Sequence, residues 1–166
     1  ALQSNKIRYV AGKSLIHTLE KNSHIRSIKQ RVDGDSGAQI KDVLIQVNLA
    51  QEVQKSGAKA EEVGGLLDEI SDSQGLVCRG LMLIPPQGAP EENRQYFRAL
   101  RKLRDELARS PRKNVELSEL SMGMSADFEV AIAEGATMIR IGTAIFGARP
   151  PLPKQGDAKE SSPHGR

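Results

Sequence analysis

The sequence predicts an α/β fold built on a parallel sheet, and three observations lead to that prediction. Short apolar runs rich in β-branched residues recur along the chain, and segments with helical spacing of apolar residues lie between them. The 166 residues, 38% of them hydrophobic, are enough for one domain with a core. Strict alternation of strand and helix favours parallel strands that are joined by right-handed crossovers.

Five runs are predicted as strands, because each is short, apolar and bounded by polar or turn-forming residues. The runs at 43–48, 79–84 and 137–141 are the clearest, and those at 15–19 and 115–120 are weaker.

Helices are predicted before and between these strands. Residues 63–70 and 91–107 carry apolar side chains at helical spacing, and the second helix follows the strand-ending Pro85-Pro86. Shorter helical patterns cover 5–11, 24–32 and 128–132, and 144–146 could form a short helix. We expect Ser125 to cap the helix at 128–132, with Asp127 in its first turn.

Two architectures fit this order of elements: an open doubly wound sheet, or part of a (β/α)8 barrel. A whole barrel typically needs about 250 residues, more than this chain has. Residues 1–6 look like the exit from a strand whose body is absent. Residues 150–166 contain four prolines and two glycines without periodicity, and we expect a disordered tail there.

The composition excludes several classes of function. A net charge of +3 spread over scattered residues, with 3% aromatics, argues against nucleic acid as a partner. No apolar stretch approaches the roughly 20 residues of a membrane span. Cys78 lies in an apolar run and is predicted to be a buried thiol in a cytoplasmic protein. His17, His24 and His164 lack metal-ligand spacing.

Two small-residue turns, at 121–125 and 142–144, each follow an apolar run. In parallel α/β folds ligands bind at the carboxyl ends of strands, where both turns are expected. Backbone N–H groups there can hold an anion, with hydroxyl donors from Ser121 and Thr143 and close backbone approach at Gly142. The alternative is that both are ordinary strand-to-helix turns.

Arg140 lies between the two turns. Because side chains alternate along a strand, Arg140 faces away from Ile139 and Ile141, and it points into a barrel if these isoleucines pack under helices. A buried guanidinium needs a partner, which is either a structural carboxylate or a ligand atom. Lys6 and Lys55 are weaker candidates on the same ligand face, and Asn48 and Glu20 are too isolated to assign.

Three segments resemble the YggS/PROSC family of pyridoxal 5′-phosphate (PLP) homeostasis proteins. They are 120–125 (LSMGMS), 140–143 (RIGT) and 145–149 (IFGAR). Shorter matches at 2–6, 55–57 and 80–82 follow in the family's order, so the resemblance covers about residues 1 to 149.

The resemblance implies a (β/α)8 TIM-type barrel like the amino-terminal domain of alanine racemase, with PLP as cofactor. It implies that Ser121, Gly142 and Thr143 hold the phosphate and that Arg140 faces the pyridine nitrogen. An arginine there donates and cannot accept, so the nitrogen stays unprotonated. That suits a cytoplasmic PLP-buffering or delivery protein without catalytic turnover.

The family's Schiff-base lysine, on its first strand, has no counterpart in this chain. We therefore expect residues 1–149 to hold five of eight strands of a partial barrel, with the first three missing. Expected partners are PLP and PLP-dependent apoenzymes, and the intact protein is expected to be a monomer. Two alternatives remain open: a PLP-dependent amino-acid racemase and a phosphate-sugar barrel enzyme.

Overall fold

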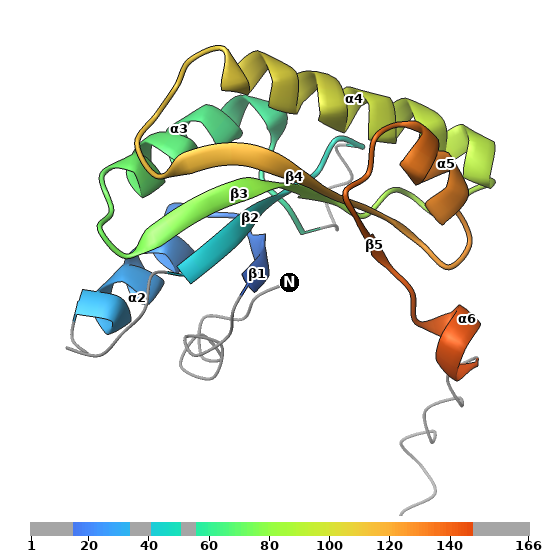
Figure 1. Ribbon diagram of the computed structural model, residues 1–166, viewed down its shortest axis with the longest axis horizontal. Coiled ribbons are helices and arrows are strands. Elements are labelled where there is room, and N and C mark those ends of the chain that lie inside the picture. The colour runs from blue at the N-terminus through green and yellow to red at the C-terminus, as the bar shows by residue number, and fades with distance from the viewer. Residues whose placement is uncertain (1–14, 34–40, 51–55, 148–166) are drawn as a thin grey trace, which may run out of the picture.

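The structure, a computed structural model, describes residues 15–33, 41–50 and 56–147. In these ranges five strands form one parallel sheet in the order β1-β2-β3-β4-β5 (Figure 1). The strands are β1 (Leu15–Leu19), β2 (Lys41–Val47), β3 (Leu76–Leu83), β4 (Val115–Met124) and β5 (Met138–Arg140). The helices that alternate with them are α2 (Asn22–Asp33), α3 (Ala60–Ser71), α4 (Pro90–Ala108), α5 (Phe128–Ala133) and α6 (Thr143–Phe146).

The predicted parallel α/β order is confirmed in the described ranges. The main difference concerns β4, which ends at Met124 rather than at residue 120. Ser121 pairs with Met138 and Met124 pairs with Arg140, so most of the predicted turn at 121–125 is strand. The helix expected at 5–11, Lys6, Lys55 and the tail expected at 150–166 lie outside the described residues.

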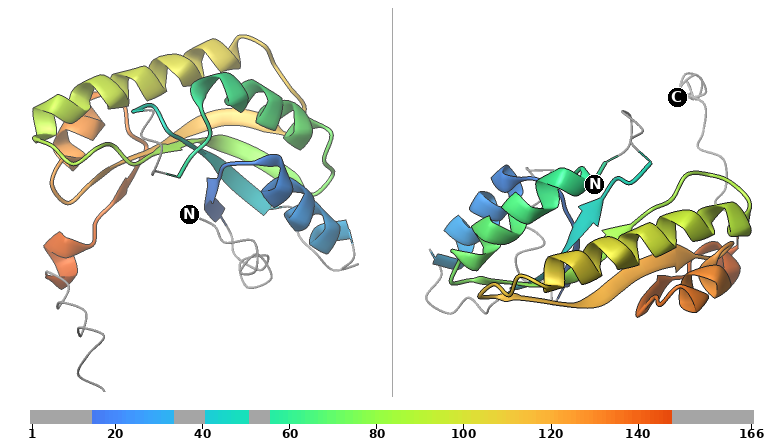
Figure 2. Two further views of the ribbon diagram at one scale, coloured as in Figure 1. Left: turned by 180° about the vertical axis from the view of Figure 1, so that it is seen from behind. Right: turned by 90° about the horizontal axis from the view of Figure 1, so that it is seen from above.

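The sheet is strongly curled. His17 Nδ1 on β1 lies 3.1 Å from Ser121 Oγ on β4, although β2 and β3 separate these strands in the sheet. Three strand spacings of a flat sheet would put them roughly 14 Å apart. Helices α2 to α5 lie on the convex side of the sheet (Figure 2). The described part is therefore a partial (β/α) barrel rather than an open sheet covered on both faces.

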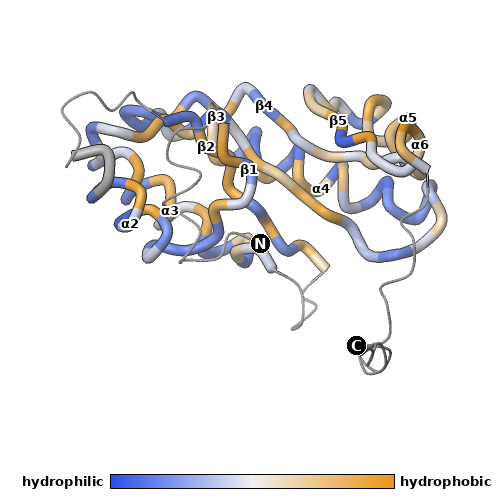
Figure 3. Tube along the Cα trace, turned by 90° about the horizontal axis from the view of Figure 1, so that it is seen from below, coloured by the Kyte–Doolittle hydropathy of each residue, from blue (hydrophilic) through white to orange (hydrophobic). Residues whose placement is uncertain are grey.

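The hydrophobic core fills the space between the convex side and the helices. Val43, Ile45 and Val47 of β2 are at most 1% exposed and belong to this core. Helices contribute fully buried residues, among them Val63, Leu67, Ile70, Phe97 and Leu100. Each such side chain contributes roughly 1.5–3 kcal/mol on burial. Figure 3 shows the hydrophobic residues running along β2 and β3.

Polar side chains on the strands reach the concave side. Because neighbours alternate along a strand, Leu44 and Gln46 face away from the helices that Ile45 packs against. Gln46 is 4% exposed and donates from Nε2 to the carbonyl oxygen of Ser56, 3.0 Å away. The concave side is thus lined in part by hydrogen-bonding groups.

An arginine cluster joins α4 to α5. The side chain of Glu134, directly after α5, is 5% exposed and accepts from Arg94 and Arg98 on α4. Arg101 pairs with the same carboxylate and also donates to the Glu134 carbonyl oxygen. These arginines, Arg98 first, lower the pKa of Glu134, so the carboxylate stays charged. The cluster holds α5, and with it the turn after β4, against the longest helix.

Cys78 is fully buried on β3, as predicted, and its thiol donates to the Gly80 carbonyl oxygen at 3.5 Å. Burial raises the pKa of Cys78 to about 12, which suits an inert thiol. No helix in the three described ranges is both long and apolar enough to cross a membrane.

The pairing of β3 with β4 depends on a glycine. Between Cys78 and Gly80 the register shifts, so that Cys78 pairs with Val115 and Gly80 with Glu119. A Cβ at Gly80 would overlap the backbone oxygen of Glu119. Only a residue without a side chain allows this close approach.

We expect Gly80→Ala to lower the free energy of unfolding by about 3 kcal/mol, because backbone atoms of β4 would have to move. Gly64→Ala on α3 is the matched control. Its Cβ would meet nothing within 4 Å, and alanine favours the helix by about 1 kcal/mol. Urea denaturation of both variants measures the difference, and equal stabilities would contradict the close-approach explanation.

Candidate functional site

A cavity of about 600 Å³ opens where β4 and β5 end and α6 begins. Its lining combines main-chain groups and small side chains with one guanidinium: Met124, Ser125, Ala126, Arg140, Gly142, Thr143 and Ala144. The carboxyl ends of parallel strands are where barrels bind ligands, and a cavity of this size is typical of small-molecule sites.

Two backbone amides converge on one oxygen at the edge of this cavity. The N–H groups of Gly142 and Ala144 both donate to Ser125 Oγ, at 3.3 and 3.2 Å. Because Ser125 Oγ accepts two hydrogen bonds, its own proton is left to donate. In the described part of the chain no acceptor is paired with that proton. The group therefore offers a hydroxyl donor flanked by amides, which suits an anion.

A buried carboxylate fixes the turn that carries Ser125. Asp127 is 5% exposed, and its Oδ1 accepts from the Met124 amide at 2.7 Å. Its Oδ2 accepts from the buried Asn93 side chain on α4 at 2.8 Å. Asp127 is also the residue at the amino-terminal cap of α5, so the expectation that Ser125 caps this helix was wrong. Ser125 instead accepts hydrogen bonds from the amides of Gly142 and Ala144.

Gly123 lets the same turn lie close to α5. It has a φ of +91°, and a Cβ there would lie 2.6 Å from the Ala131 Cβ. Both the backbone conformation and the contact favour glycine at this position. The tight packing places the end of β4, and hence Ser125, against α5.

Arg140 is the most constrained charged group at the cavity. Its Nη1 donates to the carbonyl oxygen of Ser121 at 2.9 Å and to Ser121 Oγ at 2.8 Å. Its Nη2 donates to the carbonyl oxygen of Leu83 at 2.8 Å. Burial lowers the pKa of Arg140, and Asp127 partly offsets this, but a guanidinium remains charged. Arg140 thereby links β5 to the ends of β4 and β3.

The hydrogen bonds of Arg140 bear on one of the two partners considered for it, the structural carboxylate. Within the described residues its direct acceptors are main-chain carbonyls and a hydroxyl, and no carboxylate is among them. A guanidinium has five N–H groups. Three are used here, so Nε–H and one Nη2–H remain for a ligand. The orientation predicted for Arg140, toward the concave side, agrees with these contacts.

The isoleucines next to Arg140 are less covered than expected. Ile139 is 40% exposed rather than packed under a helix. The reason is that α6 has four residues and lies away from the sheet (Figure 1). Ile145 and Phe146 of α6 are also exposed, at 68% and 84%.

Of the four predicted site residues, the structure brings three together. Arg140, Gly142 and Thr143 line the cavity. Ser121 does not, because its side chain is fully buried against Arg140 and His17. Ser125 and Ala144 also line the cavity; they lie in the two predicted turns but were not assigned as site residues from the sequence. The second serine of the LSMGMS segment was the available signal, but it was interpreted as a helix cap.

His17 lies behind Arg140 on the concave side. Its Nδ1 contacts Ser121 Oγ, which in turn contacts Arg140. Burial, and then the charge of Arg140, lower the pKa of His17, which favours the neutral ring. No pattern in the sequence connects a residue of β1 with the site.

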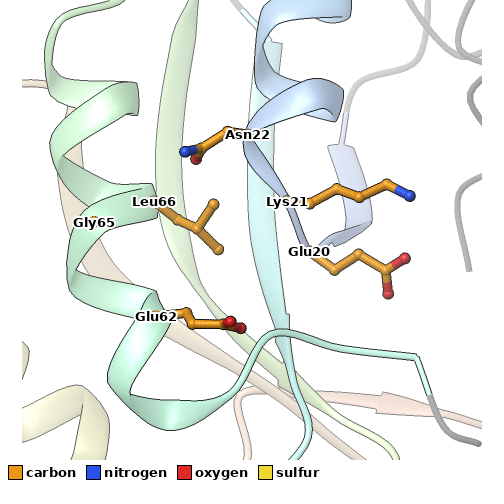
Figure 4. A pocket seen from close by; sticks show the side chains of 6 residues that line it. All are labelled: Glu20, Lys21, Asn22, Glu62, Gly65 and Leu66. Atoms are coloured by element: carbon orange, nitrogen blue, oxygen red, sulfur yellow. The ribbon is translucent and has the colours of Figure 1, made fainter.

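A second cavity, of about 390 Å³, lies at the end of β1 beside α3 (Figure 4). Glu20, Lys21 and Glu62 line it, and both Glu20 and Lys21 point away from α3. Its mixed charges favour no one class of ligand. Among the described residues, no group of three histidine, cysteine, aspartate or glutamate side chains could hold a metal ion.

Comparisons with known proteins agree on one family. The family described as "Alanine racemase, N-terminal domain" matches residues 2–150. A pyridoxal phosphate homeostasis protein of Aquifex aeolicus is 47% identical over 150 residues, which are 89% of this chain and 64% of that protein. The protein of that name from Vibrio alginolyticus is 42% identical and covered to 62%. The chain thus spans less than two thirds of these curated relatives.

A solved structure agrees as well. PipY of Synechococcus elongatus, determined with PLP bound, superposes with a TM-score of 0.78 at 33% sequence identity. The match covers 89% of this chain and 68% of that one.

A second histidine also lies inside the fold, and unlike His17 it has no hydrogen-bond partner among the described residues. His24 on α2 is fully buried, and within the described ranges neither ring nitrogen has a hydrogen-bond partner. Burial, and then the charge of Lys21, lower its pKa. His17 and His24 therefore both bind a proton more readily in the unfolded chain than in the folded one.

We expect the free energy of unfolding to fall as the pH drops below about 6.5, the ordinary pKa of histidine, because the unfolded state then binds protons that the folded state excludes. His24→Leu should raise stability by about 1 kcal/mol and make this decline shallower, since it removes unpaired polar atoms. Urea denaturation between pH 7.5 and 5.5 measures both effects. Stability that rises on acidification would contradict the neutral histidines.

Proposed function

Because this chain belongs to the YggS/PROSC family of pyridoxal phosphate homeostasis proteins, we propose that its cavity at the ends of β4 and β5 binds PLP. The observation that carries the proposal is the convergence of the Ser125 hydroxyl and the Gly142 and Ala144 amides beside Arg140. These groups fit a ligand that carries a phosphate on an aromatic ring.

The donors fit the phosphate. Phosphate oxygens accept hydrogen bonds, and bonds to charged acceptors are roughly twice as strong as neutral ones. Ser125 would donate its free hydroxyl proton, and the Gly142 and Ala144 amides would turn from Ser125 Oγ to the phosphate. Thr143 supplies a further exposed hydroxyl on the same lining. This assignment replaces Ser121, whose hydroxyl is already paired inside the fold.

Arg140 fits the pyridine nitrogen. Its two remaining N–H groups can donate to a lone pair, and a guanidinium has no acceptor and no proton to give up at neutral pH. Arg140 therefore holds the ring nitrogen in its unprotonated form. PLP supplies an aldehyde and an electron-withdrawing ring, and an unprotonated nitrogen weakens that withdrawal.

This chemistry supports a carrier more than an enzyme. We propose that the full-length protein buffers or delivers PLP without catalytic turnover, with PLP-dependent apoenzymes as recipients and a monomer as the working form. Racemases share the fold, and they need an acid/base residue beside the cofactor. In the described ranges, Arg140 is the one titratable side chain on the cavity lining. The single cysteine, which is free and buried, supports a cytoplasmic location.

We expect Ser125→Ala to weaken PLP binding by the full-length protein roughly tenfold, because a hydrogen bond to a charged phosphate is lost. Fluorescence titration with PLP measures the dissociation constant. Ser118→Ala on β4 is the matched control, since its hydroxyl reaches the Arg79 carbonyl oxygen and not the cavity.

Equal affinities for the two serine variants would remove Ser125 from the phosphate site, and an unmodified protein that does not bind PLP would overturn the proposed function. Steady racemisation of an amino acid by the full-length protein would replace the carrier role with the enzymatic one.

A further inference from the structure

A hydrogen-bonded chain of three side chains crosses the concave side of the sheet. It runs from Arg140 on β5 through Ser121 on β4 to His17 on β1. The Arg140 Nη1 to Ser121 Oγ distance is 2.8 Å, and the Ser121 Oγ to His17 Nδ1 distance is 3.1 Å. His17 and Ser121, which are 104 positions apart in sequence, are thereby linked to Arg140, which lines the cavity.

The direction of this chain follows from the donors. An arginine can only donate, so Ser121 Oγ accepts from Arg140. The single hydroxyl proton of Ser121 is then free to point to His17 Nδ1, which must carry a lone pair to accept it. This requires the neutral ring with its proton on Nε2. Burial and the nearby charge of Arg140 both favour the neutral ring.

We propose that His17 is a positioning residue for the cavity: its Nδ1 lone pair orients the Ser121 hydroxyl, which in turn holds the Arg140 guanidinium where it meets the ligand. His17 is absent from the cavity lining, so it acts through Ser121 and Arg140. The consequence for PLP binding rests on the proposed function, whereas the direction of the hydrogen bonds does not.

The alternative proton arrangement is unfavourable. With a proton on Nδ1, His17 would donate to Ser121 Oγ, which already accepts from Arg140. The Ser121 hydroxyl proton would then lose its acceptor in a fully buried position. An unpaired buried donor is costly. A doubly protonated His17 would place a second positive charge close to Arg140, with only the Ser121 hydroxyl between the two cations.

The first experiment reads the tautomer directly. Long-range ¹H–¹⁵N correlation spectra of the full-length, histidine-labelled protein without PLP distinguish a protonated from an unprotonated ring nitrogen. We expect His17 to show protonated Nε2 and unprotonated Nδ1. A proton on Nδ1, or an average of both tautomers, would overturn the proposal. This outcome is decided even if the protein does not bind PLP.

The second experiment distinguishes two roles of His17: accepting a hydrogen bond from Ser121, or only filling space. His17→Asn keeps an acceptor oxygen close to the place of Nδ1, whereas His17→Leu has the same branched shape without an acceptor. We expect His17→Leu to weaken PLP binding roughly fivefold, the value of one net hydrogen bond, and His17→Asn to stay within about twofold of the unmodified protein.

Equal losses of affinity in the two variants would show that His17 only fills space and would overturn the positioning role. Thermal denaturation of both variants accompanies the titration, so that a loss through unfolding is recognised. Failure of the unmodified protein to bind PLP would instead count against the proposed function, with the tautomer spectrum still deciding the hydrogen-bond chain.

Discussion

A guanidinium on the concave side of a curled sheet must be paired, and the arrangement of the site depends on how Arg140 meets this constraint. Leaving such a charge without partners at a partly buried position would cost several kcal/mol of folding free energy. Arg140 meets the constraint with the carbonyl oxygens of Leu83 and Ser121, which lie toward the ends of β3 and β4. Main-chain acceptors at strand ends are fixed by the sheet itself, so two of the three hydrogen bonds of Arg140 go to the backbone, and the Ser121 hydroxyl accepts the third.

The same hydrogen bonds attach β5 to β4 and β3. β5 has three residues and is at the edge of the described sheet. Arg140 joins this short strand to two others, and the chain beyond it then meets the turn after β4. That turn is held by the hydrogen bonds of Asp127 to the Met124 amide and to Asn93, and by the close packing of Gly123 on α5. The amides of Gly142 and Ala144 reach Ser125 as a result.

Much of this arrangement could be predicted from local patterns. Alternation of strand and helix gave the parallel order, and alternation of side chains along 138–142 gave the inward direction of Arg140. Ser121 and Ser125 could not be told apart in this way. They are four positions apart in one small-residue segment, and a strand that continues to Met124 rather than to residue 120 buries the first and leaves the second at the cavity. The role of His17 depends on the curl of the sheet, which no local pattern encodes.

If the backbone amides after β5 hold the phosphate of PLP, as we propose, their resonances should respond directly to the ligand. PLP is titrated into the ¹⁵N-labelled full-length protein while amide resonances are recorded. We expect the Gly142 and Ala144 signals to shift in step with binding, because their N–H groups exchange Ser125 Oγ for phosphate oxygen. Saturable binding that leaves both signals in place would show that these amides do not hold the phosphate.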